Sequence, residues 1–280
     1  MKEGLLDKYK ALYISGQNLE RGAATKIKSW VQNGGTVFAT AGAARKDEFD
    51  EPLKDLDEVL GRGAVKTSVR FRGALRQKME LPFLKPLDRV TIGAQSFDAL
   101  ASKETFEPMK GAQVLGTFAD KNPAIIKNTF GKGAAYYVST LPGQALLHKA
   151  FPNVPMGKGG EEKNSSHFEP INFDATAREV ILRPLLDANI LPDASTPQRG
   201  VVMGRLASPR STVVPIVNLA EQHDGKLKNV QLTLTGMGKK PGKVWSCFHK
   251  GGIPFQYDGG KLTLTLPTLQ TADVIVISQQ

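Results

Sequence analysis

The chain has 280 residues, of which 40% are hydrophobic and 23% are charged. This composition is that of an ordinary globular protein, and the length suffices for two domains that each bury a core, so disordered and fibrous classes are excluded. A single cysteine excludes an internal disulfide and any site built from several thiolates.

A net charge of +10 raises the question of a polyanionic partner. The basic residues are densest at residues 62–78, where no acidic residue interrupts them. This run contains no nucleic-acid motif, and its one aromatic residue is Phe71, so we interpret it as a solvated strand face. Nucleic acid is disfavoured as a partner. A polyanion site on Arg70, Arg72 and Arg76 remains the alternative.

No stretch approaches the roughly 20 apolar residues of a membrane helix, and the N-terminus lacks the apolar core of a signal peptide. We therefore expect no membrane span. The first strand follows almost at once, without the β-α unit that should precede it. We expect a fragment of a longer protein, in which an export signal could lie upstream, and the sequence assigns no compartment.

The first forty residues predict a strand, a helix and a second strand. The first strand is "ALYISG" at 11–16, and the second is "GTVFAT" at 35–40, whose continuous apolar run is typical of a parallel strand buried on both faces. Asn18 is the expected N-cap of the helix between them. The helix buries one stripe of apolar residues: Leu19, Ala23, Ile27, Trp30 and Val31.

The rest of the chain predicts appended strands and two more helical stretches, followed by a β-rich end. Pro52 is expected to open a helix over residues 52–60 that Gly61 closes. Further elements follow in chain order: strands within 64–120, a hairpin at 122–140, a short helix at 142–151, a long surface loop at 152–173 and a closing helix at 174–190, capped by Asp174 and interrupted at Pro184.

After residue 197 the apolar period becomes two, with glycine-rich turns between short strands, which is typical of a small β-sandwich. We therefore expect an α/β domain over 1–192 and an antiparallel β-sandwich domain over 197–280.

The loop after the second strand, "AGAARKDEFDEP" at 41–52, is the candidate site, because ligands of open α/β sheets bind at the carboxyl ends of strands. A glycosidase would need two carboxylates held apart on rigid elements, one with a raised pKa. Charged residues within one loop, next to a helix start, instead favour capping and surface contacts. We assign the loop to structure or to an interface, and no catalytic residue to the chain. The binding candidates are Gly42, Arg45, Asp47, Glu48 and Asp50.

Cys247 lies two residues from His249 within a predicted sandwich strand, which favours a buried core position over a nucleophile. The four histidines have no metal-ligand spacing, and surface positions are expected for His148 and His167. The two "GKG" triplets lack the context of a phosphate loop. We expect neither a metal nor a cofactor.

Residues 5–61 resemble the central part of the β-galactosidase trimerisation domain, a class I glutamine amidotransferase-like fold found beside the catalytic barrel of some glycoside hydrolases. The later hairpin and the β-rich end resemble the elements that follow in that family. The residues that carry the resemblance are Leu6, Tyr9, Lys10, Gly16, Trp30, Val31, Gly34, Gly35, Asp47, Glu48 and the stretch from Leu56 to Gly61.

The resemblance implies a flavodoxin-like three-layer α/β domain that lacks its first β-α unit, which would leave a sheet edge open, followed by a C-terminal antiparallel β-sandwich. Amidotransferases of this fold use a cysteine on a tight turn after a strand, and none stands there. The glycosidase carboxylates of such enzymes lie on a barrel that this chain does not contain.

Three functions follow from these observations. The first is a non-catalytic accessory or assembly region of a carbohydrate-active enzyme, with a second copy, an upstream catalytic domain or a carbohydrate as partner. The second is a stand-alone amidotransferase-like enzyme or glycoside hydrolase with an unrecognised nucleophile. The third is a polyanion-binding module. We favour the first.

Overall fold

The computed structural model describes residues 4–71, 80–150, 172–220 and 225–279. The chain divides into two compact units, with the boundary in the described residues between Ile190 and Leu191. Within these described ranges, no helix is long and apolar enough to cross a membrane.

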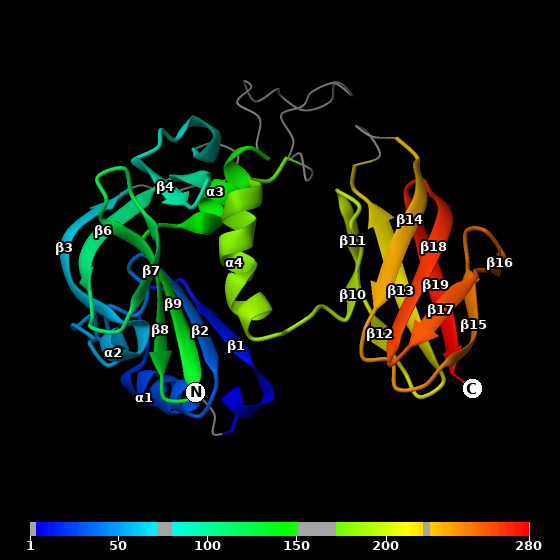
Figure 1. Ribbon diagram of the computed structural model, residues 1–280, viewed down its shortest axis with the longest axis horizontal. Helices are drawn as coiled ribbons and strands as arrows, with labels where there is room; N and C mark the ends of the chain where they lie inside the picture. Colours follow the sequence, from blue (N-terminus) through cyan, green and yellow to red (C-terminus); the bar gives the residue numbers. More distant parts are fainter. Residues whose placement is uncertain (1–3, 72–79, 151–171, 221–224, 280) are drawn as a thin grey trace. The chain divides into compact units, whose positions relative to one another are not determined.

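The first unit is built on a curled sheet of mixed direction, shown in Figure 1. Three neighbouring strands, β1, β2 and β9, run parallel, and every further neighbour is antiparallel. In sheet order the strands are β1 (Ala11–Ile14), β2 (Thr36–Thr40), β9 (Gly133–Val138), β8 (Pro123–Phe130), β7 (Gln113–Thr117), β4 (Asp88–Ile92) and β5 (Gln95–Ala99).

The predicted strand-helix-strand unit is confirmed as β1, α1 (Arg21–Gln32) and β2. Every residue of β2 is buried, as the apolar run predicted. The predicted cap is wrong, because the Asn18 side chain donates to the Asp47 carbonyl at 3.0 Å and leaves the helix start. The Glu48 carboxylate instead accepts from the Arg21 backbone N–H at 2.9 Å, where the helix needs an acceptor.

Helices cover both faces of this sheet (Figure 1). One core contains residues of α1 together with Val37 and Ala39 of β2. Phe38, between those two, points to the opposite face and packs in a second core with residues of α3 (Pro142–His148) and α4 (Ala175–Asp187). The alternation follows from the period of two in a strand. As predicted, the Asp174 carboxylate caps α4 by accepting from the Ala177 N–H at 2.9 Å.

The helix predicted over residues 52–60 is wrong in its first half. Only α2 (Asp57–Leu60) is helical, although Gly61 ends it in the left-handed conformation, as expected. The segment before α2 is hydrogen-bonded to the loop instead, since the Leu53 N–H donates to the Arg45 carbonyl at 2.9 Å. The apolar residues predicted for the inner face are buried nonetheless: Leu53, Leu56, Val59 and Leu60.

The remaining elements of the first unit are a two-stranded ribbon, β3 (Arg62–Arg70) with β6 (Ser102–Pro108), and two short 3-10 turns, η1 (Leu6–Lys8) and η2 (Leu81–Phe83). The predicted hairpin at 122–140 is confirmed as β8 and β9. The predicted surface loop at 152–173 lies almost wholly outside the described residues.

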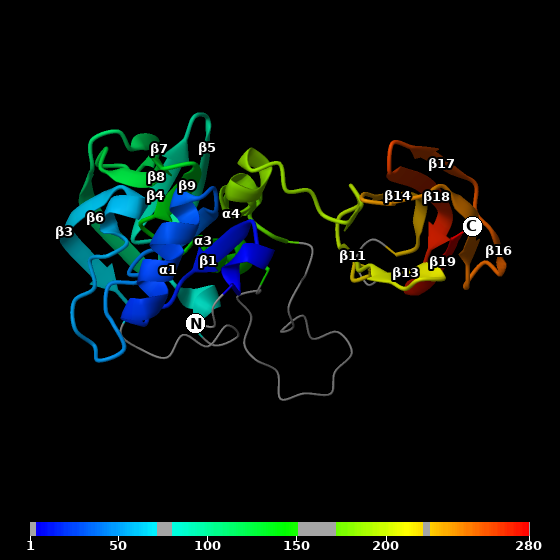
Figure 2. The same cartoon turned by 90° about the horizontal axis from the view of Figure 1, so that it is seen from below.

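The second unit contains two antiparallel sheets that share one core (Figure 2). The first sheet contains β10 (Ala194–Ser195), β14 (Leu227–Leu234), β18 (Lys261–Leu269) and β17 (Phe255–Asp258). The second contains β11 (Val201–Met203), β13 (Ser211–Asn218), β19 (Ala272–Gln279), β15 (Pro241–Ser246) and β16 (Gly251–Gly252), with β12 (Leu206–Ala207) beside β13.

Candidate functional site

The loop at 41–52 leaves the carboxyl end of β2, and its first four residues are buried. Gly42 has a φ of +75°, and a Cβ there would lie 1.2 Å from the Nη2 atom of Arg70. Only glycine therefore allows both this left-handed turn and the observed position of the Arg70 guanidinium. Arg70 donates to the Gln17 side chain at 2.7 Å and to the Ala41 carbonyl at 3.3 Å. The structure thus brings Gly42 and Arg70 together, although 28 positions separate them in the sequence.

Asp47 is the centre of the loop and is only 3% exposed. Its carboxylate accepts from the Arg21 side chain at 2.7 Å and from the backbone N–H groups of Phe49 and Glu51, both at 2.9 Å. Burial by itself would raise the pKa of Asp47, but the Arg21 guanidinium and the two N–H groups outweigh it and hold that pKa below its usual value. Asp47 is therefore a fixed anion that shapes the loop.

The other charged candidates are also engaged. Arg45 donates to Asp57 at 3.2 Å, and Asp50 accepts from Asn18 at 3.1 Å and from Lys46. The Lys46 ammonium, followed by the Asn18 amide, keeps the pKa of Asp50 below its usual value. A general acid needs a raised pKa, so neither the Asp47 nor the Asp50 carboxyl group suits that role.

Residues 48–52 of the loop are exposed, and the large apolar side chain among them is Phe49, which is 80% exposed. Two backbone N–H groups, those of Phe49 and Glu51, donate to the Asp47 carboxylate and hold the backbone around Phe49. Asp50, between them, takes a left-handed φ of +68° that tightens the turn. The charged residues therefore fix an aromatic side chain at the tip of a rigid turn.

A buried polar cluster behind the loop was not predicted. Arg62 was assigned to a solvated strand face, but it is 0% exposed. Its guanidinium donates to Asp57 at 2.7 Å and to the carbonyls of Ala43 and Ala44 at 2.7 and 3.1 Å, and it lies 5.0 Å from the centre of the Tyr137 ring. These partners come from other segments of the chain, so sequence spacing alone did not reveal the burial of Arg62.

Two other members of the basic run are described. Lys66 pairs with Glu107 at 2.6 Å, and Arg70 occupies the seat over Gly42. Arg72 and Arg76 of the polyanion alternative lie outside the described residues. Among the described members, Arg62 and Lys66 are already paired with carboxylates.

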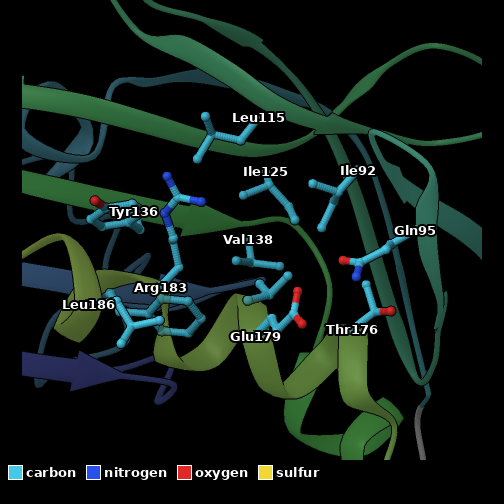
Figure 3. A pocket seen from close by; sticks show the side chains of 12 residues that line it. Ile92, Gln95, Leu115, Ile125, Tyr136, Val138, Thr176, Glu179, Arg183 and Leu186 are labelled. Carbon is cyan, nitrogen blue, oxygen red and sulfur yellow. The ribbon is translucent and has the colours of Figure 1, made fainter.

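Figure 3 shows a cavity of about 350 Å³ between α4 and the sheet. Its wall is mainly apolar, with Ile125 and Val138 on the sheet side, while Glu179 and Arg183 project from α4. Arg183 is held by Asp187 at 2.7 Å. The Tyr136 hydroxyl, from the sheet side of the wall, donates to the same Asp187 carboxylate at 2.5 Å.

The prediction that Cys247 is a buried strand residue is wrong. β15 ends at Ser246, and Cys247 is exposed in the turn that follows. His249 in the same turn is held by the Thr268 carbonyl at 2.9 Å. His148, expected at the surface, is half-buried, and His167 lies outside the described residues. Within the described part of the chain, no three His, Cys, Asp or Glu side chains are grouped as metal ligands require.

The fold and the site together define a class: an α/β domain whose charged loop is held by hydrogen bonds within the domain. The family description of the β-galactosidase trimerisation domain matches residues 6–155, which is more than half of the chain. The chain belongs to this family, whose domains are accessory regions that serve assembly.

Solved structures share the fold of the chain. Gan42B, a GH42 β-galactosidase from G. stearothermophilus, aligns with a TM-score of 0.64 and 17% identity, over 98% of this chain and 32% of its own. The β-galactosidase from Bacillus circulans sp. alkalophilus gives 0.60 and 15%, over 99% and 34%. An α-L-fucosidase from Paenibacillus thiaminolyticus gives 0.66 and 13%, over 99% and 42%.

The chain thus spans about a third of the length of the two β-galactosidases. None of the curated proteins matches it in sequence.

Proposed function

We propose that the chain is the assembly region of a larger carbohydrate-active enzyme, and that it joins copies of itself through the loop at 45–52. The observation that carries this proposal is the side chain of Phe49, which is 80% exposed at the tip of a turn held by the buried Asp47. Aromatic residues are enriched at protein interfaces, and a side chain fixed before contact loses little entropy when it binds.

The occupant that we propose for this surface is a second copy of the chain. A cyclic trimer needs a heterologous contact, in which one patch meets a different patch on the next subunit. A single protruding aromatic residue suits that geometry, because it requires a separate receiving surface. Residues 45–52 contain four acidic and two basic residues, whereas the chain carries +10, so electrostatic attraction would favour the contact.

The use of the polar groups supports assembly over the other two functions. Asp47 is committed to Arg21, and Arg45 and Arg62 both bind Asp57. A stand-alone hydrolase would need such a group free beside a substrate. A polyanion module would need unpaired cations on one face, whereas Lys66 already faces Glu107.

A second part of the proposal concerns the fold of the first unit. We infer a flavodoxin-like, amidotransferase-like sheet for the first unit. The parallel run of β1, β2 and β9, with helices on both faces, supports this inference. In the described sheet β1 pairs only with β2, so a further parallel strand could bind its free edge.

The test is the oligomeric state of the full chain, measured by sedimentation velocity over a range of protein and salt concentrations. The proposal expects a trimer that dissociates toward monomer as salt screens the contact. A chain that stays monomeric at the highest soluble concentration in low salt would contradict it.

A further inference from the structure

A second cavity, of about 300 Å³, lies where β1 and β2 end. Ser15 and Gln17 follow β1, and Ala41 follows β2, so the cavity occupies the carboxyl edge of two parallel strands. This edge is the usual ligand position in open α/β sheets. The volume is at the lower end of the range for ligand pockets, about 300–1,000 Å³, and suits a small molecule.

Two residues that line the cavity carry buried polar atoms without hydrogen bonds. Ser102 is 2% exposed, and its Oγ atom has no partner within the described structure. The same is true of the buried Oε1 atom of Gln144, on α3. Both residues line the cavity. Buried polar atoms in folded proteins nearly always have partners, so two orphans around one cavity indicate that a molecule completes them.

Arg70 supplies a positive charge at the same cavity. Both groups that hold its guanidinium, the Gln17 side-chain oxygen and the Ala41 carbonyl, are neutral. Among the described residues no carboxylate pairs with it. The seat is built into the backbone, because the guanidinium occupies the space that any side chain at Gly42 would need. The charge is therefore positioned and left uncompensated.

These groups define the chemistry of a ligand. A guanidinium favours a carboxylate, which it can bind through two parallel hydrogen bonds. The Gln144 oxygen can only accept, so the ligand must also carry a donor such as a hydroxyl group. A fully ionised sulfate has no donor, whereas a sugar acid has a carboxylate and several hydroxyls. Phe71 adds an apolar wall for the carbon skeleton.

We propose that this cavity binds a small hydroxylated carboxylate of the size of a single sugar acid. The carboxylate faces Arg70, and the hydroxyl groups face Ser102 and Gln144. This site is separate from the loop at 45–52, so its failure would leave the assembly proposal untouched.

The experiment is calorimetric titration of the full chain with glucuronate, and in parallel with neutral glucose and with sulfate. We expect saturable binding of glucuronate alone. Arg70→Gln should weaken it about tenfold or more, because a charge-assisted pair is lost, and Arg70→Lys should give an intermediate affinity. Ser102→Ala should weaken it by a smaller factor. Lys66→Gln is the matched control on the same strand and should bind like the wild type.

Circular dichroism checks that each variant folds. If folded wild-type chain takes up no glucuronate, the orphan atoms hold water and the proposal is wrong. Equal binding of glucose, or unchanged affinity in folded Arg70→Gln, would overturn the assigned role of the charge. Binding of sulfate as strong as that of glucuronate would contradict the need for a hydroxyl donor.

Discussion

Arg21 on α1 makes two hydrogen bonds to one oxygen of the Asp47 carboxylate, at 2.7 and 3.1 Å, while the other oxygen accepts two backbone N–H groups of the loop. One acidic side chain thus connects the first turn of a helix to the turn that carries Phe49. The loop is rigid because of this carboxylate.

Replacing Asp47 should loosen the loop. Asp47→Asn loses the charge that Arg21 binds, so we expect a lower unfolding midpoint at pH 7 and weaker assembly. Since the folded state lowers the pKa of Asp47 from 3.8, its contribution is present above that value and is lost as the pH falls through the folded pKa. Thermal unfolding at several pH values should show this acid-side loss in the wild type and a smaller one in the variant.

Glu51→Gln is the control, because Glu51 contacts Asp47 through its backbone: its N–H donates to the carboxylate at 2.9 Å, and its carbonyl accepts from the Asp47 N–H at 2.8 Å. It should unfold like the wild type. An Asp47→Asn chain with unchanged stability and assembly would mean that the turn does not depend on the carboxylate.

Gly42→Ala should destabilise the first unit through backbone strain and a clash. The φ of +75° alone costs about 1–2 kcal/mol for a residue with a side chain, and displacement of Arg70 adds to it. Gly93→Ala separates the two effects, since Gly93 has a φ of +55° with nothing within 4 Å of the added Cβ. Chemical denaturation should give a larger loss for Gly42→Ala; equal losses would show that Arg70 moves away at no cost.

Arg62→Met should be among the most damaging single changes in the chain. It removes one of the two cations that bind Asp57, Arg45 being the other, and the donor to two buried carbonyls. Breaking a buried ion pair from one side costs about 3–5 kcal/mol. Lys66→Met, in the exposed pair with Glu107, should change the free energy of unfolding very little. Similar effects of the two changes in urea unfolding would contradict the buried network.

Tyr137 should make the protein sensitive to alkali. Burial, and then the Glu104 carboxylate that its hydroxyl contacts, raise the pKa of Tyr137 from 10.0 to about 12. The folded state therefore binds this proton more tightly, and its contribution is complete below pH 10 and lost as the pH rises toward 12. The difference in unfolding free energy between wild type and Tyr137→Phe should shrink or reverse over this range. A constant difference would show that the hydroxyl does not titrate in this way.

Sequence patterns predicted the elements whose information is local. The stripe that contains Ile27 and Val31 specified α1, and Asp174 at the start of an apolar run specified the cap of α4. The failures have non-local causes. Backbone bonds from the loop prevent a helix at Pro52, and the fate of Arg62 depends on partners in other segments, such as Tyr137.

The place of the candidate site follows from the sequence, whereas its role stays a prediction. Proximity to a strand end singled out the loop, and its net composition indicated contact over catalysis. Two features of the site could not be predicted. The exposure of Phe49 depends on the hydrogen bonds of Asp47. The position of the Arg70 charge over Gly42 depends on the β3–β6 ribbon, which brings Arg70 to the loop. An apolar residue between acids, in a loop expected at the surface, was the available signal for Phe49.

The most direct measurement is the sedimentation mass of Phe49→Asp beside Phe83→Asp, a change at another aromatic residue that is 59% exposed. Both side chains are solvated in the single chain, so both variants should fold. We predict a trimer for the wild type and for Phe83→Asp, and a monomer for Phe49→Asp. A trimer in all three, or a monomeric wild type, would contradict it.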